Sequence, residues 1–240
     1  MTINSFYTYS KSLNDVDEDG GASGVTFYNR RLEKGRAAYD VRNRWVSTFT
    51  YELPFGKGKK YMNGGGFKNA VLGGWEFVWI QTFQTGTPFT VGFAGTPNVY
   101  LPMAQRPNQV LPNDQAKLDH VNIGPNRFPN AAQTRYLNFD AFTYPNSFTP
   151  GSLGRNTLEA PGILWAQSSL SKSWTLFERL RFNLRFDANN ITKYHSFNPP
   201  NSTFNTLDRS AFGTFNGTRG SFSDVGTGRF HGIMVFRLDW

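Results

Sequence analysis

The final residues, 230–240, alternate between apolar and polar side chains with a period of two. One register is apolar almost throughout and ends in the aromatic Trp240, whereas the other register contains His231, Arg237 and Asp239. Successive side chains of a β-strand point to opposite faces, so this pattern predicts a strand with one apolar face and one wetter face. Because unpaired chain ends usually fray, a strand pattern that continues to a terminal aromatic residue predicts that this strand is paired along its length.

The same alternation recurs along the chain. In residues 179–190 the apolar register consists mainly of Leu and Phe, and the other register carries Arg181, Arg185 and Asp187. Aromatic residues make up 16% of the chain, and richness in aromatic, Thr and Gly residues favours β structure with many turns. The predicted strands lie near residues 3–11, 41–53, 75–85, 162–172, 179–190 and 229–240.

The connections between these strands alternate between long and short. Long loops are predicted at 12–40, 86–161 and 195–227, whereas the connections at 54–74 and 173–178 are shorter. In an up-and-down sheet every second connection lies at the same end, so the alternation predicts antiparallel strands with all long loops at one end. We therefore predict an all-β fold of antiparallel up-and-down strands.

The residue content argues against several other functions. The chain has no cysteine, which excludes disulfides, thiolate zinc sites and a Cys nucleophile. The histidines lie far apart and no Gly-x-Ser-x-Gly elbow is present, so we expect no catalytic residue and no enzymatic activity. The net charge is +8, but Lys and Arg are spread over strands and turns, so we expect no nucleic-acid partner. No apolar run is long enough for a transmembrane helix.

The alternating strands fit two kinds of protein. In a soluble β-sandwich the apolar face meets the core, whereas in a membrane β-barrel it meets lipid and the polar face lines the lumen. Arg residues recur in the polar register, aromatic residues gather at strand ends, and the long loops share one end, and these three features favour a transmembrane barrel. The alternative is a soluble extracellular β-sandwich that binds a glycan or another ligand through its loops.

Each face of the predicted barrel has its own candidate residues. The candidates for the lumen are Arg42, Arg44, Arg181, Arg185, Asp187 and Arg237. The candidates for contact with lipid or for an interfacial aromatic girdle are Trp45, Phe182, Leu184, Phe186, Phe236, Leu238 and Trp240. The aromatic residues of the long loops have two interpretations, which are packing of the loops against one another and stacking on sugars.

Several motifs also recur in a characteristic order. They are Tyr7-Thr-Tyr-Ser-Lys-Ser12, Asp40-Val-Arg-Asn-Arg-Trp45, Tyr51-Glu-Leu-Pro-Phe-Gly-Lys-Gly-Lys59, Leu72-Gly-Gly-Trp-Glu76, Gln84-Thr-Gly-Thr-Pro-Phe89, Gly154-Arg-Asn-Thr-Leu158 and Arg185-Phe-Asp-Ala-Asn-Asn190. In their order and spacing they make the chain resemble the C-terminal barrel of TonB-dependent outer-membrane receptors. The resemblance is to the Oar-like group in particular, whose members carry an N-terminal carboxypeptidase-regulatory-like domain.

This resemblance implies a protein of the bacterial outer membrane that takes part in ligand uptake. Residues 1–240 would be a partial receptor barrel domain that supplies about six C-terminal strands of a larger barrel with long extracellular loops. The plug domain and the remaining strands would lie upstream and are absent here. The implied partners are outer-membrane lipid, those N-terminal plug and barrel segments, TonB acting through the plug, and an unknown small-molecule, peptide or glycan ligand. Residues 1–20 contain no apolar signal segment, so on this interpretation we expect a fragment.

One acidic segment resembles a metal-binding loop. Asp15, Asp17 and Asp19 alternate and are followed by Gly20, as at the start of a calcium loop. Thr26 stands where an EF-hand places its bidentate Glu, so the motif is incomplete. We expect a solvated acidic loop and no cofactor, with weak calcium binding in the 15–20 loop as the alternative.

Overall fold

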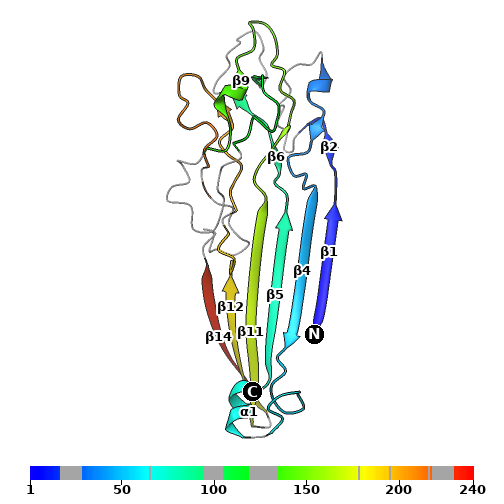
Figure 1. Cartoon of the computed structure of the whole chain (residues 1–240), viewed down its shortest axis with the longest axis vertical. Coiled ribbons are helices and arrows are strands. Elements are labelled where there is room, and N and C mark those ends of the chain that lie inside the picture. Colours follow the sequence, from blue (N-terminus) through cyan, green and yellow to red (C-terminus); the bar gives the residue numbers. More distant parts are fainter. Residues whose placement is uncertain are drawn as a thin grey trace.

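The computed structural model describes residues 1–16, 29–64, 66–93, 105–118, 135–177, 179–194, 196–215, 217 and 230–240. Its largest element is a six-stranded sheet made of β1 (Thr2–Tyr9), β4 (Asn43–Glu52), β5 (Trp75–Gln84), β11 (Ile163–Phe177), β12 (Leu180–Asn189) and β14 (His231–Asp239). These strands are adjacent in the order in which the chain visits them, and each neighbouring pair is antiparallel (Figure 1). The predicted all-β, up-and-down arrangement is confirmed.

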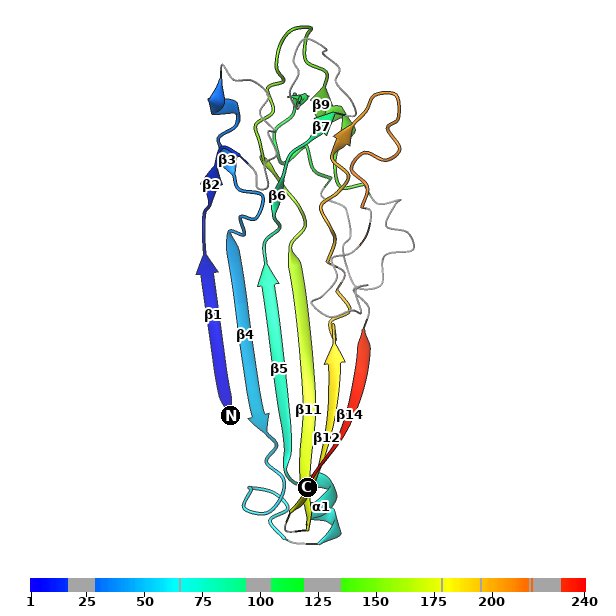
Figure 2. The ribbon, with the colours of Figure 1, turned by 180° about the vertical axis from the view of Figure 1, so that it is seen from behind.

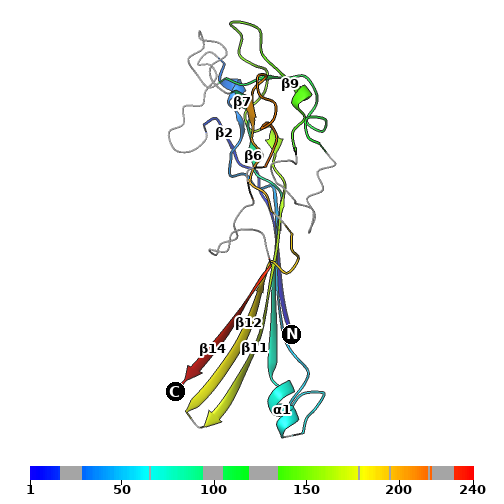
Figure 3. The same cartoon turned by 90° about the vertical axis from the view of Figure 1, so that its left-hand side faces the viewer.

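The sheet is open and curved. β1 and β14 form its two edges, and each is hydrogen-bonded to a strand on one side within the described part of the chain. Seen from the side, β11, β12 and β14 splay away from β5 and β1 (Figure 3). This curvature agrees with a segment of a barrel wall, because closing a sheet into a barrel requires its strands to tilt and coil.

The prediction of a turn at 173–178 is wrong, because β11 continues to Phe177. Ser173, Trp174 and Thr175 pair with β12, and Trp174 stacks on Phe182 with ring centroids 5.5 Å apart. The period-two alternation in this stretch is interrupted by Lys172, a charged residue that lies in the apolar register between Leu170 and Trp174. The cross-strand aromatic contact therefore extends the strand beyond the point where the sequence pattern fades.

The connections at the two ends of the sheet differ in complexity. The helix α1 (Phe67–Leu72) lies in the connection between β4 and β5, at the end opposite the elaborate loops (Figures 1 and 2). The elaborate loops contain β2 (Leu13–Asn14), η1 (Arg30–Leu32), β3 (Gly35–Arg36), β6 (Pro88–Phe89), β7 (Gly92–Phe93), β8 (Asn108–Gln109), η3 (Phe139–Ala141), β9 (Phe142–Thr143), β10 (Leu158–Glu159) and β13 (Thr203–Phe204). These short strands pair as β2–β3, β6–β10, β7–β13 and β8–β9, and of these pairs β7–β13 joins two different loops, the one before β11 and the one after β12.

The hydrophobic core lies in these loops and not against the sheet. Phe204 is at its centre, with its ring centroid 4.6 Å from that of Phe139 and 5.6 Å from that of Phe212. The cluster also contains Phe89, Val91, Ala116, Leu137, Ala141, Phe142, Leu153, Leu158 and Ala160. Aromatic residues that the sequence left open between loop packing and sugar stacking thus pack together, because burying their rings removes a large apolar area from water.

We predict that Phe204→Ala destabilises the loop domain, which is the set of elaborate loops packed around this core, by about 3–5 kcal/mol, because the substitution leaves a cavity among packed aromatic rings. The measurement is a denaturant titration in which unfolding of the loops is monitored by the loss of their protease resistance. Leu207→Ala is the matched control, because Leu207 is 95% exposed in the same loop and its loss should cost little. Equal effects of the two substitutions would contradict a core centred on Phe204.

Candidate functional site

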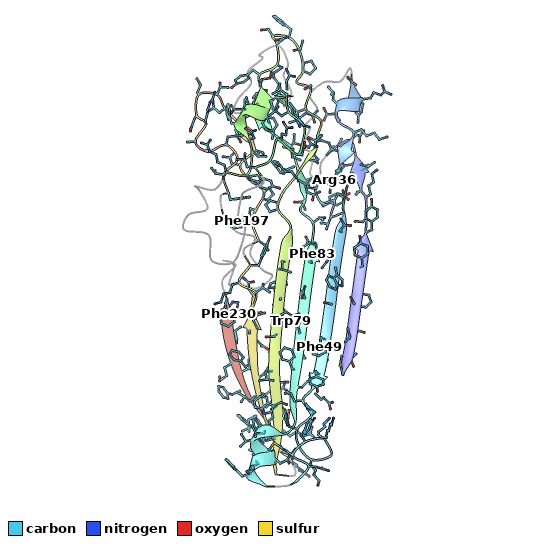
Figure 4. All side chains as sticks on the ribbon, viewed as in Figure 1. Arg36, Phe49, Trp79, Phe83, Phe197 and Phe230 are labelled. Atoms are coloured by element: carbon cyan, nitrogen blue, oxygen red, sulfur yellow. The ribbon has the colours of Figure 1, made fainter. Side chains whose placement is uncertain are left out.

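One face of the sheet carries a continuous apolar surface, called here the apolar face. The strand registers place Trp45 beside Phe83, Phe49 beside Trp79, and Leu184 beside Phe236. These side chains remain accessible, with Phe83 45% and Phe236 64% exposed. Figure 4 shows Phe49, Trp79 and Phe83 along the strands, well away from the loop core. An apolar surface that spans a whole sheet requires a cover, since monomeric soluble proteins rarely leave so large a patch in water.

Two pairs of polar side chains on the apolar face hydrogen-bond to one another. The indole N–H of Trp45 donates to Ser5 Oγ at 2.7 Å, and the hydroxyl of Tyr7 donates to Asn43 Oδ1 at 2.7 Å. An unsatisfied polar group costs several kcal/mol in hydrocarbon, where no water can replace its partner. Such pairing therefore suits a surface in contact with lipid.

Lys172 is the one charged side chain on this face among the paired residues of the sheet, and it is only 5% exposed. Its ammonium donates to the carbonyl oxygens of Ala70 at 2.6 Å and Val71 at 3.1 Å, at the end of α1. It also lies 4.9 Å from the centroid of the Trp174 ring. A cation at a helix C-terminus satisfies carbonyls that lack helical partners, so Lys172 fixes α1 against the sheet.

Two tryptophans complete this junction. The indole N–H of Trp174 donates to Ala70 O at 2.6 Å, and that of Trp75 donates to Val71 O at 2.9 Å. The two rings meet edge to face with centroids 6.2 Å apart. Aromatic residues with one polar end are typical of membrane–water interfaces, and this junction lies at the sheet end opposite the long loops.

The opposite face of the sheet, called here the polar face, carries most of the charges. The registers place Arg44, Arg181, Arg185, Asp187 and Arg237 on it, together with Glu52, Glu76 and Asp239. Arg185 Nε lies 3.0 Å from Asp187 Oδ2, and Arg237 Nε lies 2.6 Å from Asp239 Oδ1. Apolar side chains such as Ile80 and Val235 also lie on this face, so it is mixed in character.

The structure brings some lumen candidates together and separates others. Arg185 and Asp187 line a shallow hollow of about 530 Å³ with Glu76 and Asn189. Arg44 lies on β4, three strands along the sheet from β12, where it pairs in register with Gln84. Arg42 lies outside β4 and lines a pocket among the loops, so its predicted place in the strand from 41 to 53 is wrong.

The candidates for lipid contact also occupy defined positions. Trp45, Phe182, Leu184, Phe186, Phe236 and Leu238 share the apolar face by register. Trp240 follows β14 and is 93% exposed. Which medium covers each face stays a prediction that substitution can test.

We predict that Met234→Arg destabilises the membrane-inserted sheet by about 2–4 kcal/mol, the usual cost of Arg on a lipid face near the midplane. Met234 is on the apolar face, opposite Phe186. The measurement is the free energy of refolding into lipid bilayers.

Ile233→Arg is the matched control for this substitution. Ile233 is the neighbouring residue of β14 and faces the other way, opposite Asp187. An arginine there would meet a carboxylate in a wetter environment, so the cost should be much smaller. Equal costs at 233 and 234 would contradict the assignment of the apolar face to lipid.

The predicted calcium loop is described only in part. The Asp15 carboxylate pairs with Arg30, whose hydrogen bond and positive charge lower the pKa of Asp15. Asp17 and Asp19 lie outside the described residues. Within the described ranges, no group of three or more His, Cys, Asp or Glu side chains could hold a metal ion. The solvated acidic loop therefore stays the prediction, with weak calcium binding as its alternative.

An ionic network joins the loops, and the sequence analysis did not identify it. Arg36 bridges Asp40 and Glu159, with nitrogen–oxygen distances of 2.7 Å to each carboxylate. A second pair, Arg106 with Glu33 at 2.8 Å, is almost fully buried. The spacing of these residues in the sequence did not indicate the network, because the partners lie up to 123 positions apart. The one signal in the sequence was that residue 40 and residues 154–158 belong to the motifs on which the family resemblance rests.

Asp40 is held ionised within this network. Burial alone would raise the pKa of its carboxyl group, but the opposing effects are larger in sum. These are hydrogen bonds from Arg36 and the Ser12 backbone N–H, together with the charges of Arg36 and Arg42. The pKa of Asp40 is therefore lowered from its ordinary value of 3.8. Its contribution to stability is present above that value and is lost as pH falls toward the lowered pKa.

We predict that Asp40→Asn lowers the free energy of unfolding of the loop domain by about 1–3 kcal/mol at neutral pH, because a buried charged acceptor is lost. The difference from the wild type should shrink as pH falls below about 4, where the wild-type carboxylate becomes protonated. Denaturant titrations of both proteins at several pH values measure this difference in the free energy of unfolding. Asp114→Asn in an exposed loop is the control, and a loss that does not change with pH would contradict the role of the Asp40 charge.

None of the helices among the described residues is long and apolar enough to cross a membrane. A family model described as an outer membrane beta barrel domain matches residues 1–229. No significant match was found among curated proteins or among solved structures.

Proposed function

This chain belongs to the family of outer membrane β-barrel domains, and from that premise we propose that it is the C-terminal part of a TonB-dependent transporter. Its location is the bacterial outer membrane. In the proposed role the sheet forms part of the barrel wall, and the loops take part in receiving a ligand outside the cell. The role is one of transport and not of catalysis.

The observation that carries the proposal is the open sheet with two free edges. β1 and β14 each expose one row of backbone N–H and C=O groups within the described structure. Such edges are costly in lipid, where every backbone group must be paired, and a closed membrane barrel needs at least about eight strands. A six-stranded sheet therefore fits best as a segment of a larger barrel wall.

The soluble sandwich considered from the sequence fits the structure poorly. A sandwich requires a second sheet packed on the apolar face at about 10 Å. The other sheets among the described residues are two-stranded and lie in the loops, and residues such as Phe236 remain exposed. Membership of the outer membrane β-barrel family supports lipid, and not a second sheet, as the cover of that apolar face.

The packed loops at one end of the sheet support a role in ligand uptake over that of a purely structural barrel. The described loops form a packed domain with its own core above one end of the sheet (Figure 1). Binding residues commonly lie on loops that a rigid scaffold positions. The polar face below them carries charged side chains and a hollow, as a wall facing a water-filled interior would.

The test is retention of the complete encoded protein by the periplasmic domain of TonB from the same organism. The protein would be extracted from outer membranes in mild detergent and passed over immobilised TonB domain. We expect specific retention, together with a plug-like segment encoded upstream of Met1 in the same reading frame.

The matched control is the same protein with that upstream segment deleted, which should assemble in the outer membrane but lose TonB retention. Absence of a plug-coding segment, together with no retention of the complete protein, would rule out the TonB-dependent role. Membership of the outer-membrane barrel family would stand in either case.

A further inference from the structure

A second pocket lies among the loops, outside the spanning part of the sheet. It has a volume of about 640 Å³ and is formed by four segments of chain, which are 11–13, 31–42, 113–117 and 154–159. Arg36, labelled in Figure 4, marks its position beyond the loop end of β4. The volume falls within the range of about 300–1,000 Å³ that is usual for small-molecule sites.

The lining of this pocket is strongly basic. It includes seven basic side chains, Lys11, Arg31, Lys34, Arg36, Arg42, Lys117 and Arg155, and one acidic side chain, Glu159. Glu159 is already engaged by Arg36, which also binds Asp40. Because the single lining carboxylate is used in this way, it does not balance the remaining cations.

Five of the basic groups have no ion-pair partner in the part of the chain that the structure describes. They are Lys11, Arg31, Lys34, Arg42 and Lys117, of which Arg42 acts on the Asp40 carboxylate through its charge without a contact ion pair. Like charges that converge on one concavity repel one another, and a cleft with low-dielectric walls concentrates their field. An anion that enters the pocket would relieve this repulsion.

Arg42 gives independent evidence for a missing acceptor. Its Nε is buried and has no hydrogen-bond partner among the described residues. Its backbone is fixed, because Arg42 O accepts from Ser10 N at 3.0 Å and Val41 O accepts from the Ser10 hydroxyl at 2.6 Å. A buried donor without an acceptor costs about 1–3 kcal/mol, so such a group usually has a ligand or water partner.

The walls of the pocket are held in place before any ligand arrives. Arg155 Nε donates to Glu33 O at 2.8 Å, and Asn156 Nδ2 donates to Arg36 O at 2.7 Å. A Cβ at Gly35 would lie 2.4 Å from Arg155 O, so only glycine permits this close approach of the two segments. Preorganisation of this kind lowers the entropic cost of binding.

We propose that this pocket binds a small ligand carrying at least two oxyanion groups, through Arg42 and Lys117 with support from Lys11, Arg31 and Lys34. Arginine and lysine are the side chains that recognise phosphate and carboxylate oxygens, and several cations require more than one negative group. The ligand reaches the pocket as a free solute or as the headgroup of an anionic lipid. This inference is independent of the proposed transport role, because the pocket can bind an anion whether or not the protein transports a ligand.

The experiment is isothermal titration of the complete encoded protein, purified in a zwitterionic detergent, with pyrophosphate. Maltose is the uncharged probe. We expect saturable binding of pyrophosphate at low salt, weaker binding at high salt, and no binding of maltose. A parallel titration with micelles containing phosphatidic acid, compared with micelles of phosphatidylcholine alone, distinguishes a lipid headgroup from a free solute.

Arg42→Gln and Lys117→Gln should each weaken binding of the preferred anion about tenfold or more, because each removes a charge-assisted contact. Lys57→Gln is the matched control, because Lys57 is exposed in the connection that contains α1, at the other end of the sheet, and binding should not change. Thermal unfolding checks that each variant is folded. If Arg42→Gln does not fold, Lys117→Gln alone decides.

Three outcomes would overturn the proposal. They are no saturable binding of pyrophosphate or phosphatidic acid, equal binding by the wild type and the folded pocket variants, or equal weakening by Lys57→Gln. None of them bears on TonB retention, so failure of the anion site and failure of the transport role are distinguishable.

Discussion

The ladder of backbone hydrogen bonds across the six-stranded sheet is the constraint on which the rest of the structure depends. In lipid no water can satisfy a free backbone group, so each strand must be paired by its neighbours. The registers of this ladder also decide which side chains share a face, because a slip of one residue would move every side chain to the other face. The apolar face, the polar face and the end of the sheet that carries the loops all follow from it.

The sheet and the loops place their apolar side chains in different environments. The sheet leaves side chains such as Phe236 exposed, whereas the loops bury Phe204 and its neighbours in a core of their own. The loop core removes the apolar area of these side chains from solvent. The sheet and the loops also differ in where their charged side chains lie. On the sheet most lie on one face, while in the loops Arg36, Asp40 and Glu159 join distant segments.

The basic pocket depends on this loop framework. Asp40 and Glu159 fix Arg36, and close packing of Gly35 on Arg155 joins the two segments that form its walls. The network therefore neutralises some of the positive charge and leaves the rest facing one cavity. A site of this kind can change its ligand through a few loop residues while the strands below it keep their pairing.

The sequence by itself determined the strands, their antiparallel order and the separation of apolar from polar faces. It could do so because period-two alternation is a local property, visible in segments such as 179–190. It missed the extension of β11 to Phe177, because Lys172 interrupts the apolar register there, and the Trp174–Phe182 contact continues the strand pairing beyond it. Only the tertiary structure revealed the loop core, the Arg36 network and the basic pocket. Their residues lie far apart in the chain, and packing and charge pairing at such separations leave no local pattern to read.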